Sequence, residues 1–230
     1  MGIRRGPNIV QSGLVLSLDA GNVRSYPGSG TTWRDVSGNG NAEMVNSPVF
    51  ENSPKSFTFD GTADYFSVTS NTAFKSITGD ITLTGWCKQN STGGAPHQTI
   101  LGTSLDYRHG IKLMSYYHGG IAVWLANGAG TGDYLLSSSG IADTGWRFLA
   151  ATRNSSTGLL ELFLDGVRVN YVTTFTGATN NNQNAAIGTD YHSSGYYYYG
   201  NIVTASAYNR VLQASEILQN YNMTKSRFGK

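Results

Sequence analysis

The chain has 230 residues, and hydrophobic residues make up 39% of them, including 4 Trp, 14 Tyr and 9 Phe, which is enough for a substantial core in one large β domain or two small ones. The formal net charge of +2 is too small to indicate a nucleic-acid partner. Charged residues are only 13% whereas Gly numbers 29, a balance typical of short strands joined by turns and not of helices.

The first segment, residues 1–13, has little to bury and is predicted to be an extended arm. Leu14–Leu18 is the first predicted strand, and a long loop rich in turn-forming residues follows it. Runs of β-prone residues bounded by turn signals then recur without a convincing helical period. These further strands are predicted at Ser56–Asp60, Tyr65–Val68, Ile81–Lys88, Thr99–Gly102, Gly110–Ser115, Gly120–Ala126, Trp146–Arg153, Leu159–Leu164, Val167–Val172, Ala185–Ile187 and Gly200–Tyr208.

The clearest strand signal lies between Trp146 and Val169. Two β-prone runs flank the polar turn Asn154–Gly158, and a second tight turn follows at Asp165–Gly166. This turn chemistry is typical of three consecutive antiparallel strands. Together with the regular spacing of the other strands, it predicts an all-β fold, a two-sheet antiparallel sandwich.

One short helix is predicted near the end of the chain, where three apolar side chains fall on one side: Ile217, Leu218 and Tyr221. Glu216 stands at the third helical position of a capping box, but Gln213 stands where Ser or Thr normally caps. We therefore expect a helix start that is weaker by roughly 0.5–1 kcal/mol than one with Ser.

Composition does not change within residues 14–222, so we predict one domain there, with two extended terminal arms: residues 1–13 and the basic tail at residues 223–230. The start of the chain lacks the apolar core of a signal peptide, and no stretch approaches the roughly 18 apolar residues of a membrane span. We therefore expect a protein made in a cytoplasm, without membrane insertion. The single cysteine, Cys87, cannot form an intramolecular disulfide and is expected to be a small buried side chain.

Segments spread over most of residues 14–222 resemble the laminin-G-like, concanavalin-A-like jelly-roll domains. The similar segments are Phe57–Tyr65, Ile81–Trp86, Trp146–Val169, Gly200–Val203, Ala207–Leu212 and Glu216–Leu218. Each motif is weak alone, but their order is specific. The resemblance implies a jelly roll of that type, and any step from this fold to a function is by analogy.

Both ends of the chain look like tailed-phage virion proteins that carry this domain. The similar segments are Arg5–Val10, Gly13–Asn22, Ser25–Trp33, Ser37–Asn41 and Asn220–Gly229. The resemblance implies a location in the virion, as a capsid decoration, a head fibre or a tail adhesin, without separating the three. Other virion proteins would then be partners, and a homo-oligomer on a symmetric lattice is expected.

The residues of an enzyme are not found. Glycoside hydrolases need two carboxylates across the scissile bond, and the laminarinase-type members of this fold carry Glu-x-Asp-x-Glu along one strand. The nearest match, Glu161 to Asp165, has the wrong spacing. No Gly-x-Ser-x-Gly elbow, phosphate loop or histidine pair at zinc spacing is present. We therefore predict a non-enzymatic protein, with a glycoside hydrolase as the third alternative.

Calcium is the one cofactor that the sequence leaves open, although none is required. Ca²⁺ takes several oxygens from Asp, Asn and backbone carbonyls. By resemblance to the pentraxins, the matching loops hold Asp106 and Asp190, the candidate calcium ligands, but His192 stands where another acid would help. Ordinary turn-forming aspartates are the alternative. Asp60 and Asp64 are predicted to bind local N–H groups in a turn.

Tyrosines are concentrated late in the chain, at Tyr191 and at Tyr196–Tyr199. In a strand, alternation would bury two of the last four and expose the other two. Exposed Tyr rings stack on sugars and anchor interfaces. The candidate ligand-binding residues are therefore Tyr107, Tyr191, Tyr196 and Tyr198. Sheet packing is the alternative interpretation of these rings.

Both termini are basic, and the candidate anchoring residues are Arg4, Arg5, Lys225 and Arg227. They would dock the protein on an acidic capsid or a neighbouring subunit; solvated tails are the alternative. Two hypotheses follow. In the first, the protein is a non-enzymatic virion surface protein that binds the particle and could also bind host-surface glycans. In the second, it is a calcium-assisted lectin that holds host-surface polysaccharide near the tyrosines.

Overall fold

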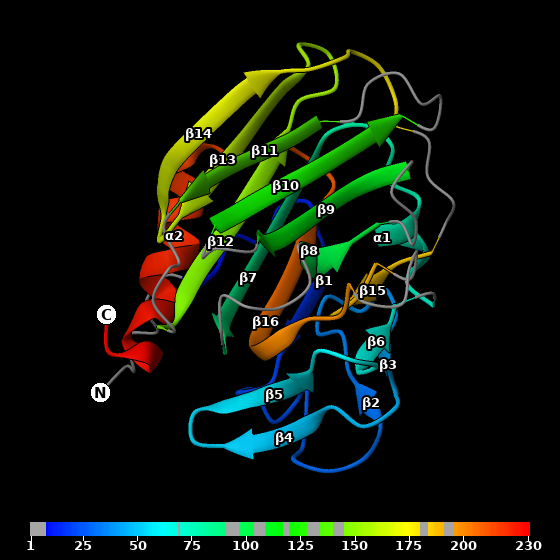
Figure 1. The fold of residues 1–230 in the computed structure, drawn as a ribbon, viewed down its shortest axis with the longest axis vertical. Coiled ribbons are helices and arrows are strands. Elements are labelled where there is room, and N and C mark those ends of the chain that lie inside the picture. Colours follow the sequence, from blue (N-terminus) through cyan, green and yellow to red (C-terminus); the bar gives the residue numbers. More distant parts are fainter. Residues whose placement is uncertain are drawn as a thin grey trace, which may run out of the picture.

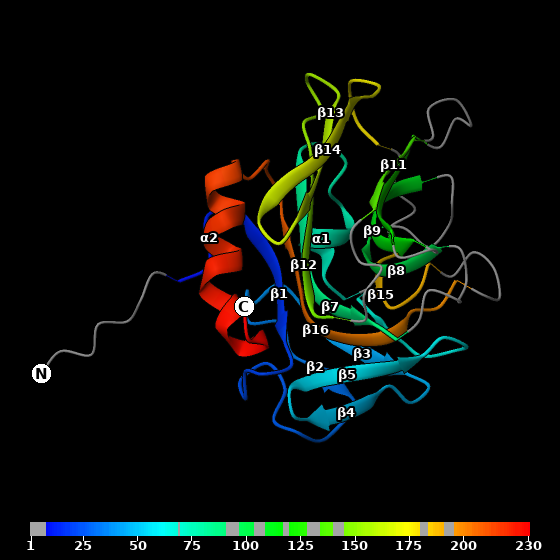
Figure 2. The ribbon, with the colours of Figure 1, turned by 60° about the vertical axis from the view of Figure 1, so that its left-hand side comes forward.

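The computed structural model describes residues 8–68, 70–90, 97–103, 109–116, 120–127, 134–139, 145–179, 184–190 and 196–230. Their strands form two antiparallel sheets that face each other, and helix α2 (Ala214–Thr224) lies on the outer side of the first sheet (Figures 1 and 2). The predicted all-β, two-sheet sandwich with a short C-terminal helix is confirmed. No helix in the described part of the chain is long and apolar enough to cross a membrane.

Eight of the described strands form the first sheet, which we call sheet A. In spatial order they are β14 (Val167–Thr173), β13 (Leu159–Leu164), β12 (Arg147–Arg153), β7 (Ile81–Gln89), β16 (Tyr199–Tyr208), β5 (Lys55–Asp60) and β4 (Val49–Asn52), with β1 (Leu14–Asp19) paired to β16. The three strands predicted around the Asn154 and Asp165 turns are β12, β13 and β14, paired in that order.

Sheet B contains the other eight described strands. In spatial order they are β11 (Tyr134–Ser139), β10 (Gly120–Asn127), β9 (His109–Tyr116), β8 (His97–Gly102), β15 (Ala186–Ile187), β6 (Tyr65–Ser67), β3 (Ala42–Val45) and β2 (Thr32–Trp33). Four of the sixteen strands lie where none was predicted: β2, β3, β4 and β11. The first three have two to four residues within or beside a turn-rich loop, too short for a periodic signal. The single helical turn α1 (Thr72–Lys75) was also not predicted.

The main core fills the space between the sheets, where alternate side chains of the central strands of both sheets point. The ring of Phe57 illustrates its density, with centroids 4.7 Å from Tyr26, 4.8 Å from Trp33 and 4.7 Å from Phe66. Full burial of such a side chain contributes about 1.5–3 kcal/mol. Cys87 is buried here as expected, and burial raises the pKa of its thiol to about 12.

A second apolar cluster lies on the outer face of sheet A, beneath α2. It contains Trp86, Phe148 and Phe163 from the sheet and Ile217 from the helix. The central strand β7 is therefore buried on both faces, which explains its nearly continuous apolar and small-residue run.

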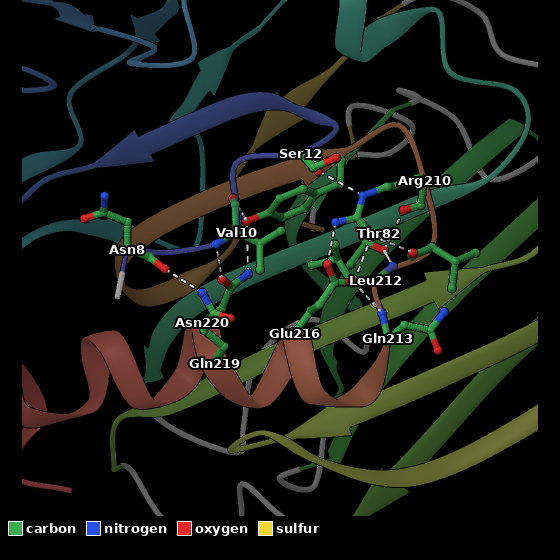
Figure 3. Close-up of polar contacts among 12 residues, drawn as sticks. Asn8, Val10, Ser12, Thr82, Arg210, Leu212, Gln213, Glu216, Gln219 and Asn220 are labelled. Carbon is green, nitrogen blue, oxygen red and sulfur yellow. Dashed lines mark hydrogen bonds and ion pairs between the residues drawn. The ribbon is translucent and has the colours of Figure 1, made fainter. Parts of the chain in front are cut away.

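The start of α2 is held by a charged side chain. The Glu216 carboxylate accepts a hydrogen bond from the Gln213 backbone N–H at 2.9 Å and two from the Arg210 guanidinium at 2.6 and 2.8 Å (Figure 3). Hydrogen bonding to Arg210 lowers the pKa of Glu216. The weak start expected from Gln213 is thus reinforced by Glu216, which Arg210, three positions before the cap, holds in place.

The described part of the N-terminal arm is not free but is fastened to α2. Asn220 accepts a hydrogen bond from the Val10 N–H at 2.8 Å and donates one to the Tyr208 hydroxyl at 3.0 Å, and that hydroxyl donates to the Val10 carbonyl at 3.1 Å. Val10 and Asn220 are buried. Figure 3 shows the segment from Asn8 to Ser12 running along the helix. The prediction that this part buries little is therefore wrong.

The C-terminal tail is helical, not extended as expected. A 3-10 helix, Lys225–Phe228, continues α2, and the Phe228 ring stacks on Trp86 at a centroid distance of 4.1 Å. Arg227 binds Asp19 at 2.8 and 2.9 Å, and the Lys225 ammonium lies 5.3 Å from the Tyr221 ring. Two candidate anchoring residues therefore contact the domain itself. Arg4 and Arg5 lie outside the described residues.

Asp60 organises a turn, as predicted, whereas Asp64 accepts one local hydrogen bond from the Asp60 N–H at 3.3 Å and a shorter one from the distant Ser47 N–H at 3.0 Å. Asp60 accepts hydrogen bonds from the Thr62 hydroxyl and from the N–H groups of Thr62, Ala63 and Asp64. Burial raises the pKa of Asp60, but these hydrogen bonds outweigh that effect and lower it to about 2.

A pH dependence follows for this turn. Because the folded-state pKa lies below the ordinary 3.8, the stabilisation is fully present above about pH 4 and is lost as the pH falls toward about 2. The carboxylate is well exposed, so solvent screening keeps the effect small. We expect Asp60→Asn to show a smaller drop in Tm than the native protein over this range. Equal drops in both proteins would show that Asp60 does not contribute.

Candidate functional site: the outer face of sheet B

Two large polar or aromatic side chains project from neighbouring strands on the outer face of sheet B. In β9, Ile111 and Leu113 pack into the core, so Lys112 points to the opposite side. Trp124 does the same in β10 and lies directly opposite Lys112 in the strand register. Gly102 of β8 pairs with Lys112 on its other side, where a Cβ atom would lie 2.9 Å from Lys112 Cγ. The absence of a side chain there gives the lysine its space.

Lys112 and Asp190 form a buried ion pair. Lys112 Nζ lies 3.5 Å from Asp190 Oδ2, and the two residues are only 1% and 3% exposed. Charged groups at this depth are costly to bury unless they are paired. Buried charged groups of this kind are common at functional sites, where they are retained although they lower stability.

Aromatic rings lie beside this pair: Trp124 stands opposite Lys112 in the strand register, and the His97 imidazole interacts electrostatically with both charges. The His97 imidazole lies with its centroid 6.2 Å from Trp124 and 5.5 Å from Tyr196, in edge-to-face geometry with both. Burial lowers the pKa of His97, and the Lys112 charge lowers it further while Asp190 opposes both. The imidazole is thus neutral at pH 7 and can both donate and accept a hydrogen bond.

These five side chains, which we call the sheet-B site, come from β8, β9, β10 and the segments after β15 and before β16: His97, Lys112, Trp124, Asp190 and Tyr196. His97, Trp124 and Tyr196 are partly exposed. The arrangement offers aromatic surface beside polar groups of both signs. Such a combination can hold a flat, hydroxyl-rich ligand by stacking and hydrogen bonding.

The structure separates the four consecutive tyrosines differently from a strand alternation. Strand β16 begins only at Tyr199, which is 38% exposed, while Tyr196 and Tyr197 are partly buried. Tyr198 is 0% exposed, edge-to-face with Phe59 at 6.0 Å. Its assignment as a ligand-binding residue is therefore wrong, because its ring belongs to the core. Tyr107 and Tyr191 lie outside the described residues.

Of the two candidate calcium ligands, Asp190 is in the sheet-B site and Asp106 lies outside the described residues. The Asp190 carboxylate faces an ammonium group, which would compete with a cation. Within the described ranges, no group of three or more His, Cys, Asp or Glu side chains is arranged to hold a metal ion.

Sequence reasoning missed His97, Lys112 and Trp124 as site residues. One signal was available: Lys112 is the only charged residue in the run Gly110–Ser115. A lysine within an otherwise apolar strand is rarely fully buried unless it is paired. Its partner Asp190 is 78 positions away, and no local pattern connects the two.

The comparisons with known proteins agree with this fold. A family model described as the concanavalin A-like lectin/glucanases superfamily matches residues 60–218, well over half of the chain. A search of the curated proteins by sequence finds no match.

Among solved structures, the chain is similar to binding domains of botulinum neurotoxins. They include the binding domain of serotype D (TM-score 0.70, 17% identity, 93% of this chain and 52% of that chain). A second is the DC binding domain in complex with SialylT (TM-score 0.70, 15% identity, 93% of this chain and 51% of that chain). A third is the DC binding domain in complex with rat synaptotagmin II (TM-score 0.67, 15% identity, 91% of this chain and 51% of that chain). The chain spans about half the length of these structures. At such identities the likeness shows the fold alone.

Proposed function

Because the chain belongs to the concanavalin A-like lectin/glucanases superfamily, we propose that it is a non-catalytic carbohydrate-binding protein whose sheet-B site holds a glycan of a host surface. The observation that supports this most is the grouping of Trp124, Tyr196 and His97 around the Lys112–Asp190 pair. The similar domain solved in complex with SialylT is consistent with the proposal but belongs to another protein.

The chemistry of the site suits sugars. The C–H faces of a pyranose ring are apolar and stack on an aromatic ring, whereas its hydroxyl groups exchange hydrogen bonds with polar side chains. Trp124 supplies aromatic surface, and the neutral imidazole of His97 supplies a donor and an acceptor. Beneath these groups, the buried Lys112–Asp190 ion pair forms a polar floor.

The absence of catalysis is part of the proposal. Hydrolysis of a glycosidic bond requires two carboxyl groups flanking that bond. Among the described residues of the sheet-B site, Asp190 is the only carboxylate, and it faces Lys112. Asp165 stands in a turn with a backbone φ of 50°. Its carboxylate accepts hydrogen bonds from the Phe148 N–H, Arg147 and Lys230.

We propose the setting as well: the surface of a phage virion, as a capsid decoration, fibre or adhesin with other virion proteins as partners. Support comes from the resemblance of both ends of the chain to tailed-phage virion proteins. The first described residue, Asn8, contacts Gln219 of α2, and the C-terminus also lies on the α2 side of the molecule (Figure 2), whereas the sheet-B site faces the other way. Attachment at the termini would thus leave the site directed away from the particle.

Substitution of Trp124 tests the binding function. The native protein is first applied to a broad glycan array with calcium and then with a chelator, and the best ligand is titrated by calorimetry. We expect Trp124→Ala to weaken that binding at least tenfold, since loss of a stacking aromatic costs on the order of 1–3 kcal/mol. Binding that vanishes in chelator would favour the calcium-assisted version.

The matched control is Tyr171→Ala, which removes a 60%-exposed aromatic ring from β14 of sheet A. It is expected to bind like the native protein. Silence of the folded native protein on the array in both conditions, or unchanged binding by Trp124→Ala, would refute the carbohydrate-binding proposal at this site. Attachment to the particle would then be the function to pursue.

A further inference from the structure

A separate hollow lies on the outer face of sheet A and is lined in part by residues of the β4–β5 hairpin. Figure 1 shows the position of this hairpin at one end of the sheet. Its volume is about 270 Å³, near the lower end of the roughly 300–1,000 Å³ typical of small-ligand pockets. Such a space suits one sugar ring and not an extended oligosaccharide. The side chains that matter here are Glu51, Ser56, Thr58, Lys88, Trp146 and Asn201.

The strand pattern places these polar groups on the outer face. Phe57, Cys87 and Ile202 pack into the core between the sheets. Their sequence neighbours therefore point outward: Ser56 and Thr58 from β5, Lys88 from β7 and Asn201 from β16. Asn201 pairs with Thr58 on one side and with Lys88 on the other, so the three side chains stand in a row across the sheet.

Hydrogen bonds hold the floor of the hollow in place. The Asn201 side-chain amide donates to the Thr58 hydroxyl at 2.6 Å and to the Ser56 hydroxyl at 3.3 Å. The Ser56 hydroxyl in turn donates to the Pro54 carbonyl at 3.2 Å. The Oδ1 atom of Asn201 accepts no hydrogen bond from a described residue and remains available to a ligand hydroxyl. A floor organised in advance lowers the entropy cost of binding.

Trp146 forms a wall of the hollow, and its ring packs against the ring of Phe228. The Trp146 and Phe228 rings lie with centroids 5.1 Å apart, and Phe228 also stacks on Trp86. A fixed, partly exposed indole beside hydroxyl and amide groups is the combination that binds one face of a pyranose. Glu51 and Lys88 contribute one negative and one positive charge, so the hollow favours neither an acidic nor a basic sugar.

We propose that this hollow is a second carbohydrate-binding site, specific for a neutral pyranose ring that stacks on Trp146 and hydrogen-bonds to Asn201. It lies on the face opposite the sheet-B site and shares no residue with it. The inference goes beyond the proposed function, since either site can bind without the other. A protein with two such sites could join two glycan chains or bind one surface with greater avidity.

The four tryptophans allow both sites to be tested in one experiment. Trp33 and Trp86 are fully buried, Trp124 lies in the sheet-B site and Trp146 lines the hollow. In a ¹H–¹⁵N correlation spectrum each indole N–H gives one signal. The native protein is titrated with methyl glycosides of glucose, galactose, mannose and N-acetylglucosamine, with glycerol as the non-specific control. We expect at least one sugar to shift the Trp146 indole and the Asn201 side-chain amide saturably, while Trp33, which lies in the core between the sheets, stays unchanged.

Asn201→Ala should weaken this binding at least tenfold without moving the shifts at Trp124. Glu161→Ala, on the same face of sheet A but away from the hollow, is the matched control and should titrate like the native protein. Shifts at Trp124 alone would overturn the second site while supporting the proposed function, and shifts at Trp146 alone would do the reverse. Linear, glycerol-like shifts at Trp146, or unchanged binding by Asn201→Ala, would also overturn this inference.

Discussion

Replacing Lys112 by methionine is expected to lower the free energy of unfolding by about 3–5 kcal/mol, because it leaves the Asp190 carboxylate buried without its ammonium partner. Methionine keeps the length and much of the volume of the lysine stem, so the loss reports mainly on charge. Urea unfolding followed by tryptophan fluorescence gives the free energy through the shift in midpoint at constant slope.

A double variant separates the pair from its surroundings. Lys112→Met combined with Asp190→Leu removes both charges, and it should recover most of the stability lost in the single variant. Arg168→Ala breaks an ion pair with Glu161 in which the arginine side chain is 50% exposed, and little change is expected there. If Lys112→Met unfolded at the same urea concentration as the native protein, Lys112 and Asp190 would not form the buried ion pair on which the sheet-B site depends.

The second large effect is expected at Asn220. Asn220→Ala leaves the buried Val10 N–H without its acceptor, at a cost of about 1–3 kcal/mol. It also removes the hydrogen bond that the Tyr208 hydroxyl accepts, worth about 0.5–1.5 kcal/mol, although this hydroxyl still donates to the Val10 carbonyl. We expect a total loss of about 2–4 kcal/mol in the free energy of unfolding. Gln219→Ala removes the neighbouring exposed bond to the Asn8 carbonyl and should change stability by less than about 0.5 kcal/mol.

Hydrogen exchange adds a local readout for the same variant. Because Asn220 connects the N-terminal segment to α2 (Figure 3), its loss should abolish protection of the Val10 amide more than that of the β7 amides. Equal losses of protection throughout the sheet would show that the effect is global and that the segment has no separate fastening. Unchanged stability and unchanged protection at Val10 would show that Asn220 does not hold the N-terminal segment on α2.

Much of the fold could be predicted from the sequence because its determinants are local. Strands β12, β13 and β14 follow from turn residues at Asn154–Gly158 and Asp165–Gly166 and from runs of β-prone side chains between them. The helix at Ala214–Thr224 follows in the same way from the spacing of Ile217, Leu218 and Tyr221. Asp60 was recognisable as a turn residue because its hydrogen-bond partners are its own neighbours in the chain.

The candidate sites could not be predicted in this way, because their residues meet only through sheet pairing and packing. Tyr198 was predicted to bind a ligand because it lies among four consecutive tyrosines, yet its ring is buried in the core against Phe59. Phe228 belongs to a tail that looked merely basic, yet its ring stacks on Trp86, which lies 142 residues earlier in the chain. Asn201, Thr58 and Lys88 become one floor only when β16 is inserted between β5 and β7.

The sequence by itself thus determined the all-β class, most strands and the local turns, since propensity and turn chemistry act over a few residues. Which face of each strand carries the sheet-B site and the hollow, and which charges and rings meet there, was decided by the tertiary structure alone. Burial and pairing depend on partners brought together across the whole chain. The Lys112–Asp190 pair in one sheet and the Val10–Asn220 bond across 210 residues exist only once the sandwich has formed.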